Sequence, residues 1–154
     1  MKIAKDEARI LTLLQREGRL SNVELAKRSH ISESPCLRKT RALEEAGVIS
    51  GYRAVVDPKL LGCSISAVIM VNLDQRSETD SAAFFEAVQR EERIVECLAI
   101  TGPNDLVLRV VARDIDDLGQ LTMEGILRFP SVKDIASCVV IKEIKRMSPL
   151  PILD

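Results

Sequence analysis

The sequence predicts an α+β protein with a helical first part and a second part in which strands and helices alternate. Helical periodicity of apolar residues dominates up to residue 62, and strand-like alternation begins directly after it. Between the two patterns, Pro58 interrupts regular structure and Gly62 relaxes the backbone. We therefore expect two domains, residues 1–62 and residues 63–154.

Charge is distributed unevenly between the two parts. Residues 1–62 hold 12 Lys/Arg and 8 Asp/Glu, a net charge of +4, whereas residues 63–154 hold 10 and 15, a net charge of −5. A basic first domain indicates a polyanionic partner such as double-stranded DNA. No apolar run reaches the ~18 residues of a membrane span, and charged residues at positions 2, 5 and 6 argue against a secretory signal. We expect a cytoplasmic protein without a membrane partner.

The sequence lacks the residues that several classes of chemistry require. His30 is the only histidine, and the four cysteines are far apart without a C-x-x-C pair, so neither a metal site nor a redox dithiol is expected. We interpret the cysteines as small buried apolar residues. No phosphate-binding glycine loop occurs, and Glu96 and Asp105 lack a nucleophile or metal partner. We predict no enzymatic activity and no cofactor.

Local signals predict three helices in the first domain. The first runs from about Lys5 to Glu17, and Gly18 ends it. Ser21 with Glu24 forms a capping box at the start of a short second helix that ends near residue 28 or 29. A tight turn at residues 30–31 leads to a third helix, which starts at Ser32 or Ser34 and ends near residue 46. This spacing is typical of a helix-turn-helix.

The third helix has two different sides. One side carries Cys36, Leu37, Thr40 and Leu43, which we expect to pack inward. The other side presents donors that can reach base edges in a major groove, although a merely solvated charged face remains an alternative. Residues 48–56 predict a small hairpin, or wing, in which Tyr52 packs. The predicted DNA contacts are Ser32, Ser34, Pro35, Arg38, Lys39, Arg41 and, from the wing, Arg53.

The sequence of the second domain predicts the order β-α-β-β-α-β of a ferredoxin-like fold. Strands are expected over residues 64–73, 94–101, 105–112 and 135–144. One helix over residues 80–91 would bury Phe84, Phe85 and Val88, and another would start at Asp114 and end before Pro130. Helices cover one face of such a sheet, and the other face is largely apolar here. Burial of that face predicts at least a homodimer.

Taken together, these stretches resemble the Lrp/AsnC, or feast/famine, regulators over nearly the whole chain. The matching stretches are residues 18–26, 34–38 and 41–52 in the first domain, and Glu96-Cys97, Thr101-Gly102, Val139-Val140 and residues 142–145 in the second. The resemblance implies a winged helix-turn-helix joined to an effector-binding domain called RAM. It also implies dimers that assemble into octamers or larger particles and a response to an amino acid.

The family's effector loop is usually G-D-x-D-Y, and here it reads Gly102-Pro103-Asn104-Asp105-Leu106. Only the glycine and the second acidic residue are kept, so a different effector, or none, stays an alternative. An α-amino acid needs an acceptor for its ammonium group and donors for its carboxylate. The predicted effector contacts are Thr101, Gly102, Asn104, Asp105, Ser137 and Cys138.

Two functions are therefore compared below. The first is a sequence-specific DNA-binding regulator that responds to an amino acid. The alternative is a ligand-sensing module that regulates a protein partner without specific DNA binding, which the basic first domain disfavours.

Overall fold

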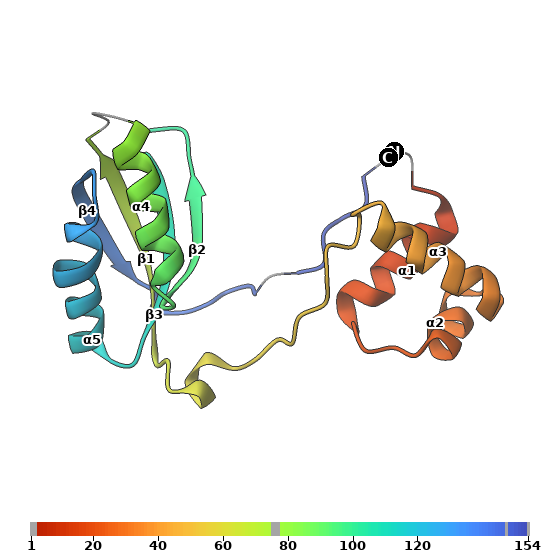
Figure 1. The fold of residues 1–154 in the computed structure, drawn as a ribbon. Coiled ribbons are helices and arrows are strands. Elements are labelled where there is room, and N and C mark those ends of the chain that lie inside the picture. Colours follow the sequence, from red (N-terminus) through yellow and green to blue (C-terminus); the bar gives the residue numbers. More distant parts are fainter. Residues whose placement is uncertain (1–2, 75–77, 147, 154) are drawn as a thin grey trace. The chain divides into compact units, whose positions relative to one another are not determined.

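The computed structural model describes residues 3–74, 78–146 and 148–153. The chain forms two compact units, Met1–Val55 together with Ile144–Asp154, and Val56–Glu143 (Figure 1). This division differs from the predicted one in two places. Residues 56–62 group with the second unit, and the last segment of the chain returns to the first unit because it packs on the helices there.

The first unit contains the three predicted helices, α1 (Lys5–Arg16), α2 (Asn22–Ser29) and α3 (Glu33–Glu45). The Ser21 hydroxyl accepts a hydrogen bond from the Glu24 backbone N–H at 3.2 Å, which confirms the predicted cap of α2. Ser32 is the residue before α3, and Gly47 beyond its end has a φ of 70°, a left-handed conformation that favours glycine. The core consists of Ile10, Leu11, Leu25, Ala26, Cys36 and Leu43.

The second unit is the predicted ferredoxin-like sheet with two main helices. Its elements are β1 (Ile65–Leu73), α4 (Glu78–Arg90), β2 (Ile94–Ala99), β3 (Leu106–Ala112), α5 (Ile115–Gln120) and β4 (Val132–Val139). Short helical turns at Pro58–Leu61, Leu121–Gly125 and Ile126–Arg128 complete it. The strand order is β2-β3-β1-β4, and every neighbouring pair is antiparallel.

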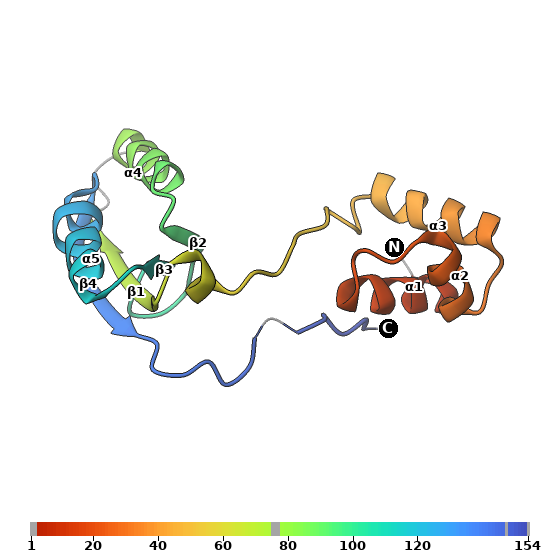
Figure 2. The same ribbon diagram turned by 90° about the horizontal axis from the view of Figure 1, so that it is seen from below.

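The core of this unit lies between the sheet and the helices (Figure 2). Alternate residues of the two central strands point to it, among them Ile69 of β1 and Leu108 of β3, which are paired and fully buried. Phe84 and Val88 of α4 and Leu118 of α5 cover them from the helix side. The alternation of apolar residues predicted for residues 64–73 is therefore confirmed, and β3 shows the same alternation of burial.

The opposite face of the sheet is largely apolar and partly open. Its apolar residues, together with Cys138, are Val68, Met70, Leu98, Val107, Val111 and Ala136, of which Leu98 is 48 % exposed. Arg109 of β3 and its neighbour Glu96 of β2 lie on the same face. The expectation of an apolar second face is thus met in this chain. Among the described residues, no helix has the length and apolar character needed to cross a bilayer.

Two structural expectations in this unit are wrong. The last strand runs over Val132–Val139 rather than residues 135–144, since its pairing with β1 ends at Ala67 and Val139 and is followed by one bond from the Val140 N–H to the Ser66 carbonyl. Phe85 is 50 % exposed, because it follows the buried Phe84 by one residue and therefore lies about 100° around α4.

A buried carboxylate anchors the start of α5, and no local sequence pattern indicates it. Asp114 caps the helix by accepting from the Asp117 N–H at 2.8 Å, as predicted. Asp117 itself is buried and accepts from the Arg93 guanidinium at 2.9 Å and from the Arg113 N–H at 2.9 Å. These bonds hold the pKa of the Asp117 carboxyl below its usual value, and the bond from Arg93 joins α5 to the residue just before β2.

Candidate DNA-binding and effector sites

α2 and α3 are joined by a tight turn that restrains the orientation of α3 relative to α2. His30 ends α2 in the left-handed conformation with φ 58°, which reverses the chain within a few residues. The Asn22 side chain, at the start of α2, donates to the Glu33 carbonyl at the start of α3 over 3.0 Å. Both N-termini are therefore linked, and the orientation of α3 relative to α2 is restrained at its first turn.

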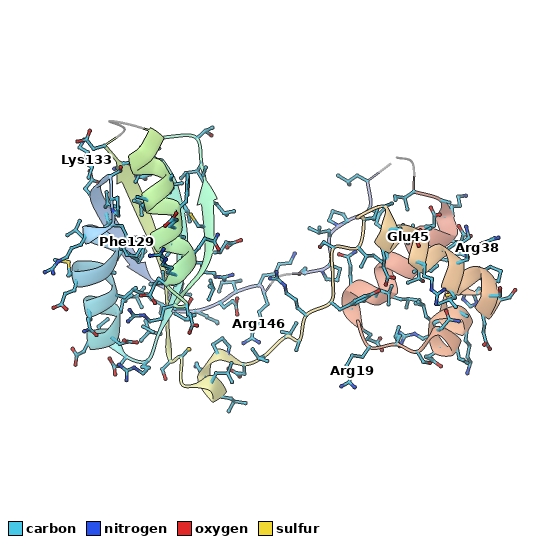
Figure 3. The ribbon with its side chains drawn as sticks, in the orientation of Figure 1. Arg19, Arg38, Glu45, Phe129, Lys133 and Arg146 are labelled. Atoms are coloured by element: carbon cyan, nitrogen blue, oxygen red, sulfur yellow. The ribbon has the colours of Figure 1, made fainter. Side chains whose placement is uncertain are left out.

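The side of α3 that faces away from the core carries the predicted donors. Ser34, Arg38 and Arg41 are exposed and follow one another at four and three residues, so they form one stripe. Arg38 is labelled on α3 in Figure 3. Ser32 is exposed at the N-cap, and Pro35 is half-buried in the first turn.

Leu37 was expected to pack inward, and this expectation is wrong. Its side chain is 39 % exposed. It lies three residues after Ser34 and four before Arg41, so helical geometry places it on the exposed stripe. The sequence did not reveal this, because a leucine next to the buried Cys36 satisfies the inward pattern equally well. An apolar group on this stripe is suited to contact with a thymine methyl group.

Lys39 has a different environment from the two arginines. Its ammonium group lies 2.9 Å from the Asp6 carboxylate and 3.9 Å from that of Glu7, both on α1. The hydrogen bond from Lys39 lowers the pKa of the Asp6 carboxyl below its usual value of 3.8. Lys39 thus secures α3 to α1, and its predicted contact with a phosphate would have to compete with these carboxylates.

The segment after α3 does not form the predicted hairpin. Residues 50–57 are described and contain no strand. An isolated two-stranded hairpin is marginal in water, and Val55, at 90 % exposure, contributes little burial to stabilise one. Arg53 is exposed, as a phosphate contact requires.

Tyr52 packs beside the α1–α2 connection, as expected. Its ring lies so close to Gly18 that a Cβ there would be 3.4 Å from a ring carbon. The hydroxyl donates to the Glu44 carboxylate at 2.9 Å, and partial burial together with this bond raises the Tyr52 pKa to about 12. The same connection carries Arg19, which is exposed (Figure 3) and was not singled out from the sequence.

The predicted effector loop joins β2 to β3, and part of it has a structural role. The Asp105 carboxylate accepts from the Leu73 N–H at 2.8 Å and so ties the loop to the end of β1. Thr101 and Gly102 are exposed, and Gly102 has a φ of 127°. Asp105 can still receive a ligand, because a carboxylate has further acceptor positions.

A chain of polar side chains extends from this loop across the sheet. Asn104 donates to the Asn72 side chain at 3.2 Å, and Asn72 donates to the Asp134 carboxylate at 2.7 Å. Asn72 and Asp134 are paired across β1 and β4. The sequence analysis missed both, because residues in separate strands become neighbours only once the register is known.

Ser137 and Cys138 lie on β4 but not on one face. Ser137 is paired with Ile69, which faces the helices, whereas Cys138 is paired with Val68 on the opposite face. Both lie three or more residues along β4 from Asp134, which corresponds to roughly 10 Å or more. In one chain, the structure therefore brings Asp105 and Asn104 near Asp134 rather than near this pair.

The cysteines have different surroundings from one another. Cys36 is buried, Cys63 and Cys97 are half-buried, and Cys138 is exposed, so the interpretation of all four as buried apolar residues is wrong for Cys138. Burial raises the pKa of the Cys97 thiol, which favours its inert neutral form. Within residues 3–74, 78–146 and 148–153, no cluster of His, Cys, Asp or Glu is arranged to hold a metal ion.

Two families match the chain, and they cover its two parts. Residues 66–150 match the Lrp/AsnC ligand-binding domain, and residues 7–50 match a winged helix-turn-helix DNA-binding domain. The chain belongs to the Lrp/AsnC family of transcriptional regulators. The predicted family, fold class and regulatory function are thereby confirmed, and a sensor module without DNA binding is not favoured.

Relatives and solved structures agree with this membership over at least 93 % of the chain. The leucine-responsive regulatory proteins of Klebsiella pneumoniae and Escherichia coli K12 are 38 % identical over 93 % of this chain and 87 % of their own. A Neisseria meningitidis transcriptional regulator, solved as an L-methionine complex, is 33 % identical with a TM-score of 0.93 over 97 % of both chains. An AsnC-family regulator from Agrobacterium tumefaciens is 28 % identical with a TM-score of 0.89 over 96 % of both.

The ion pair between Lys39 and Asp6 predicts a pH-dependent first unit. Because the pKa of Asp6 is lower in the folded state, its contribution to stability is complete above the usual value of 3.8 and is lost as the pH falls through the folded pKa. We expect the free energy of unfolding to fall less in Asp6→Asn than in the unsubstituted protein when the pH is lowered from about 6 to about 3. Tyr52 is the only tyrosine in a chain without tryptophan, so its fluorescence during urea unfolding reports on this unit.

Glu45→Gln is the matched control, because Glu45 is an exposed carboxylate on α3 (Figure 3) that lies outside this ion pair. An equal effect of both substitutions would show that the Asp6–Lys39 contact contributes nothing specific.

Proposed function

We propose that the chain reads DNA through the exposed stripe of α3 as part of a homodimer. We also propose that an amino acid bound at the RAM domain modulates DNA binding. The observation that carries the proposal is the arrangement of Ser34, Leu37, Arg38 and Arg41 on one exposed side of a helix whose other side is buried. Arg38 and Arg41 are suited to guanine, the base that arginine contacts most often.

The other predicted contacts have supporting roles in this proposal. Ser32 and the first turn around Pro35 lie at the N-terminal end of α3, the end whose residues contact base edges in helix-turn-helix proteins. Arg53 in the segment after α3 contacts phosphate. Lys39 acts mainly by holding α3 on α1 and reaches phosphate only if it leaves Asp6.

Arg38→Ala tests base reading. We expect it to weaken binding to a duplex selected from a random pool by about 1–3 kcal/mol and to relax sequence preference, because a bidentate arginine–guanine contact is lost. Binding is measured at several stated salt concentrations, because phosphate contacts give a steep salt dependence. Arg90→Ala, an exposed arginine on α4, is the control. Equal loss on selected and random duplexes would identify Arg38 as a phosphate contact only.

The proposed dimer is held by the open apolar face of the sheet. Val68, Met70 and Val107 on this face are only half-buried in one chain, and a second copy would remove them from water. Two copies related by a two-fold axis present two α3 helices to half-sites about one helical turn apart, or a multiple of it. The resemblance extends this proposal to octamers or larger assemblies.

Val107→Arg tests the dimer. A second positive charge on this face, two residues from Arg109, should convert the particle to a monomer in light scattering, because an unpaired buried charge is costly. Val23→Arg, at an exposed valine of α2, should leave the mass unchanged. If the unsubstituted protein is monomeric, or if Val107→Arg keeps its mass, the proposed face is not the interface.

The effector site centres on the loop after β2 and on the polar chain beside it. Asp105 or Asp134 can accept from an ammonium group, and the Thr101 hydroxyl with the Gly102 and Asn104 N–H groups can donate to a carboxylate. Ser137 or Cys138 would contribute only where a second copy completes the site, because they lie on opposite faces of β4. The L-methionine complex of the Neisseria relative supports an amino acid as the effector class.

A thermal-shift screen of the twenty amino acids tests this site. A ligand at 100 times its dissociation constant should stabilise the protein by about 2.7 kcal/mol, and L-leucine and L-methionine are the first candidates. We expect Asp134→Asn to weaken that response with little loss of stability, whereas Asp105→Asn also destabilises the loop held to Leu73. Asp116→Asn, on the exposed side of α5, is the control. If no amino acid shifts the transition, the effector belongs to another chemical class or is absent.

The remaining predictions follow from the regulatory role. The relatives named above are transcriptional regulators, and we propose that this chain likewise has no catalytic activity and needs no cofactor. Because its target is DNA, we keep the prediction of a cytoplasmic location.

A further inference from the structure

The last described segment of the chain packs on the first unit rather than on the sheet that precedes it. Residues Ile144–Asp154 belong to the same compact unit as the three helices. Both ribbon views draw this blue segment beside the helices of that unit (Figures 1 and 2). Neither family match includes Ile152, since one ends at residue 150 and the other at residue 50.

Gln15 of α1 recognises the backbone of this segment. Its side-chain N–H donates to the Leu150 carbonyl at 3.2 Å, and its side-chain oxygen accepts from the Leu150 N–H at 2.6 Å. One amide therefore pairs with both backbone groups of one residue, as a neighbouring strand would. Pro149 and Pro151 have no N–H, so Leu150 supplies the only backbone donor among these three residues. The Gln15 side-chain oxygen accepts the hydrogen bond from it.

The same segment also contributes an apolar anchor. Ile152 is partly buried and packs against the core of the first unit, whereas Leu153 is 83 % exposed. Ala8, Thr12 and Leu13 of α1 and residues 149–152 line a shared groove. The two prolines restrict the free segment to extended conformations, which lowers the entropy lost on docking.

We propose that Pro149–Leu153 is a strap that docks on α1 of its own chain and completes the DNA-binding unit. The strap follows β4, so the DNA-binding unit has a second covalent connection to the RAM domain in addition to the segment after α3. A change at β4 on effector binding then reaches α1 directly along the chain. This regulatory consequence rests on the proposed effector function, but docking of the strap does not.

The test compares Ile152→Ser with Leu153→Ser in the full chain. We expect Ile152→Ser to lower the urea midpoint followed by Tyr52 fluorescence and to accelerate amide exchange in α1 by about tenfold, the factor for losing roughly half the burial of one isoleucine. Leu153→Ser, one residue further and exposed, should leave both unchanged. Equal behaviour of the two variants would overturn the proposal.

Gln15→Ala tests the backbone contact separately. It should accelerate exchange in α1 in the full chain but have no further effect in a chain that ends at Ser148, because its partner Leu150 is then missing. An equal effect in both chains would assign Gln15 a role within the helix and overturn the strap.

The strap must also dock within its own chain. A Val107→Arg variant shown to be monomeric should keep the protection of α1, and loss of protection there would assign the strap to a second copy. DNA affinity and the amino-acid response are then measured on Ile152→Ser. Unchanged DNA binding with faster α1 exchange would restrict the strap to stability and overturn its regulatory consequence, leaving the proposed function intact.

Discussion

The burial of one side of α3 is the constraint on which the DNA-binding unit depends. Cys36 and Leu43 belong to the core, and the helical repeat then determines that Arg38 and Arg41 face outward. A rotation of α3 by one residue would turn this stripe by about 100° and expose the core side chains. The contact between Lys39 and Asp6 restrains the same rotation from α1. Reading a base sequence needs such a rigid presentation, and a surface helix with no buried side would not provide it.

Features set by neighbouring residues could be predicted from the sequence. Ser21 and Asp114 cap their helices with the bonds that their spacing indicates, because a cap involves residues only three positions apart. Gly47 adopts the left-handed conformation expected after a helix end. The alternation of Ala67, Ile69 and Val71 predicted the buried face of β1 without knowledge of its partner strands, because side chains of a strand alternate between faces.

Features set by distant partners could not be predicted. The end of β4 depends on where β1 begins, and the network of Asn72 and Asp134 depends on the register between those strands. Gln15 and Leu150 lie 135 residues apart, and nothing local to either indicates the contact. Leu37 and Phe85 illustrate a second limit, since each is apolar and adjoins a buried residue, yet lies about 100° around the helix from it and outside the buried side. Which side of a helix is buried is decided by the neighbouring elements, not by the type of each residue.

The position of residues 144–154 also changes how charge is divided between the units. Residues 1–55 carry a net charge of +4, and residues 144–154 add Lys145, Arg146 and Asp154, a net charge of +1. The first unit therefore has a net charge of +5, and residues 56–143 have −6. The overall charge of −1 conceals this separation. A duplex attracts the first unit and repels the second, and screening limits both effects to about 10 Å at 0.1 M salt. Electrostatics therefore favour approach of the first unit to the DNA before any base contact forms, which leaves discrimination between sequences to short-range contacts.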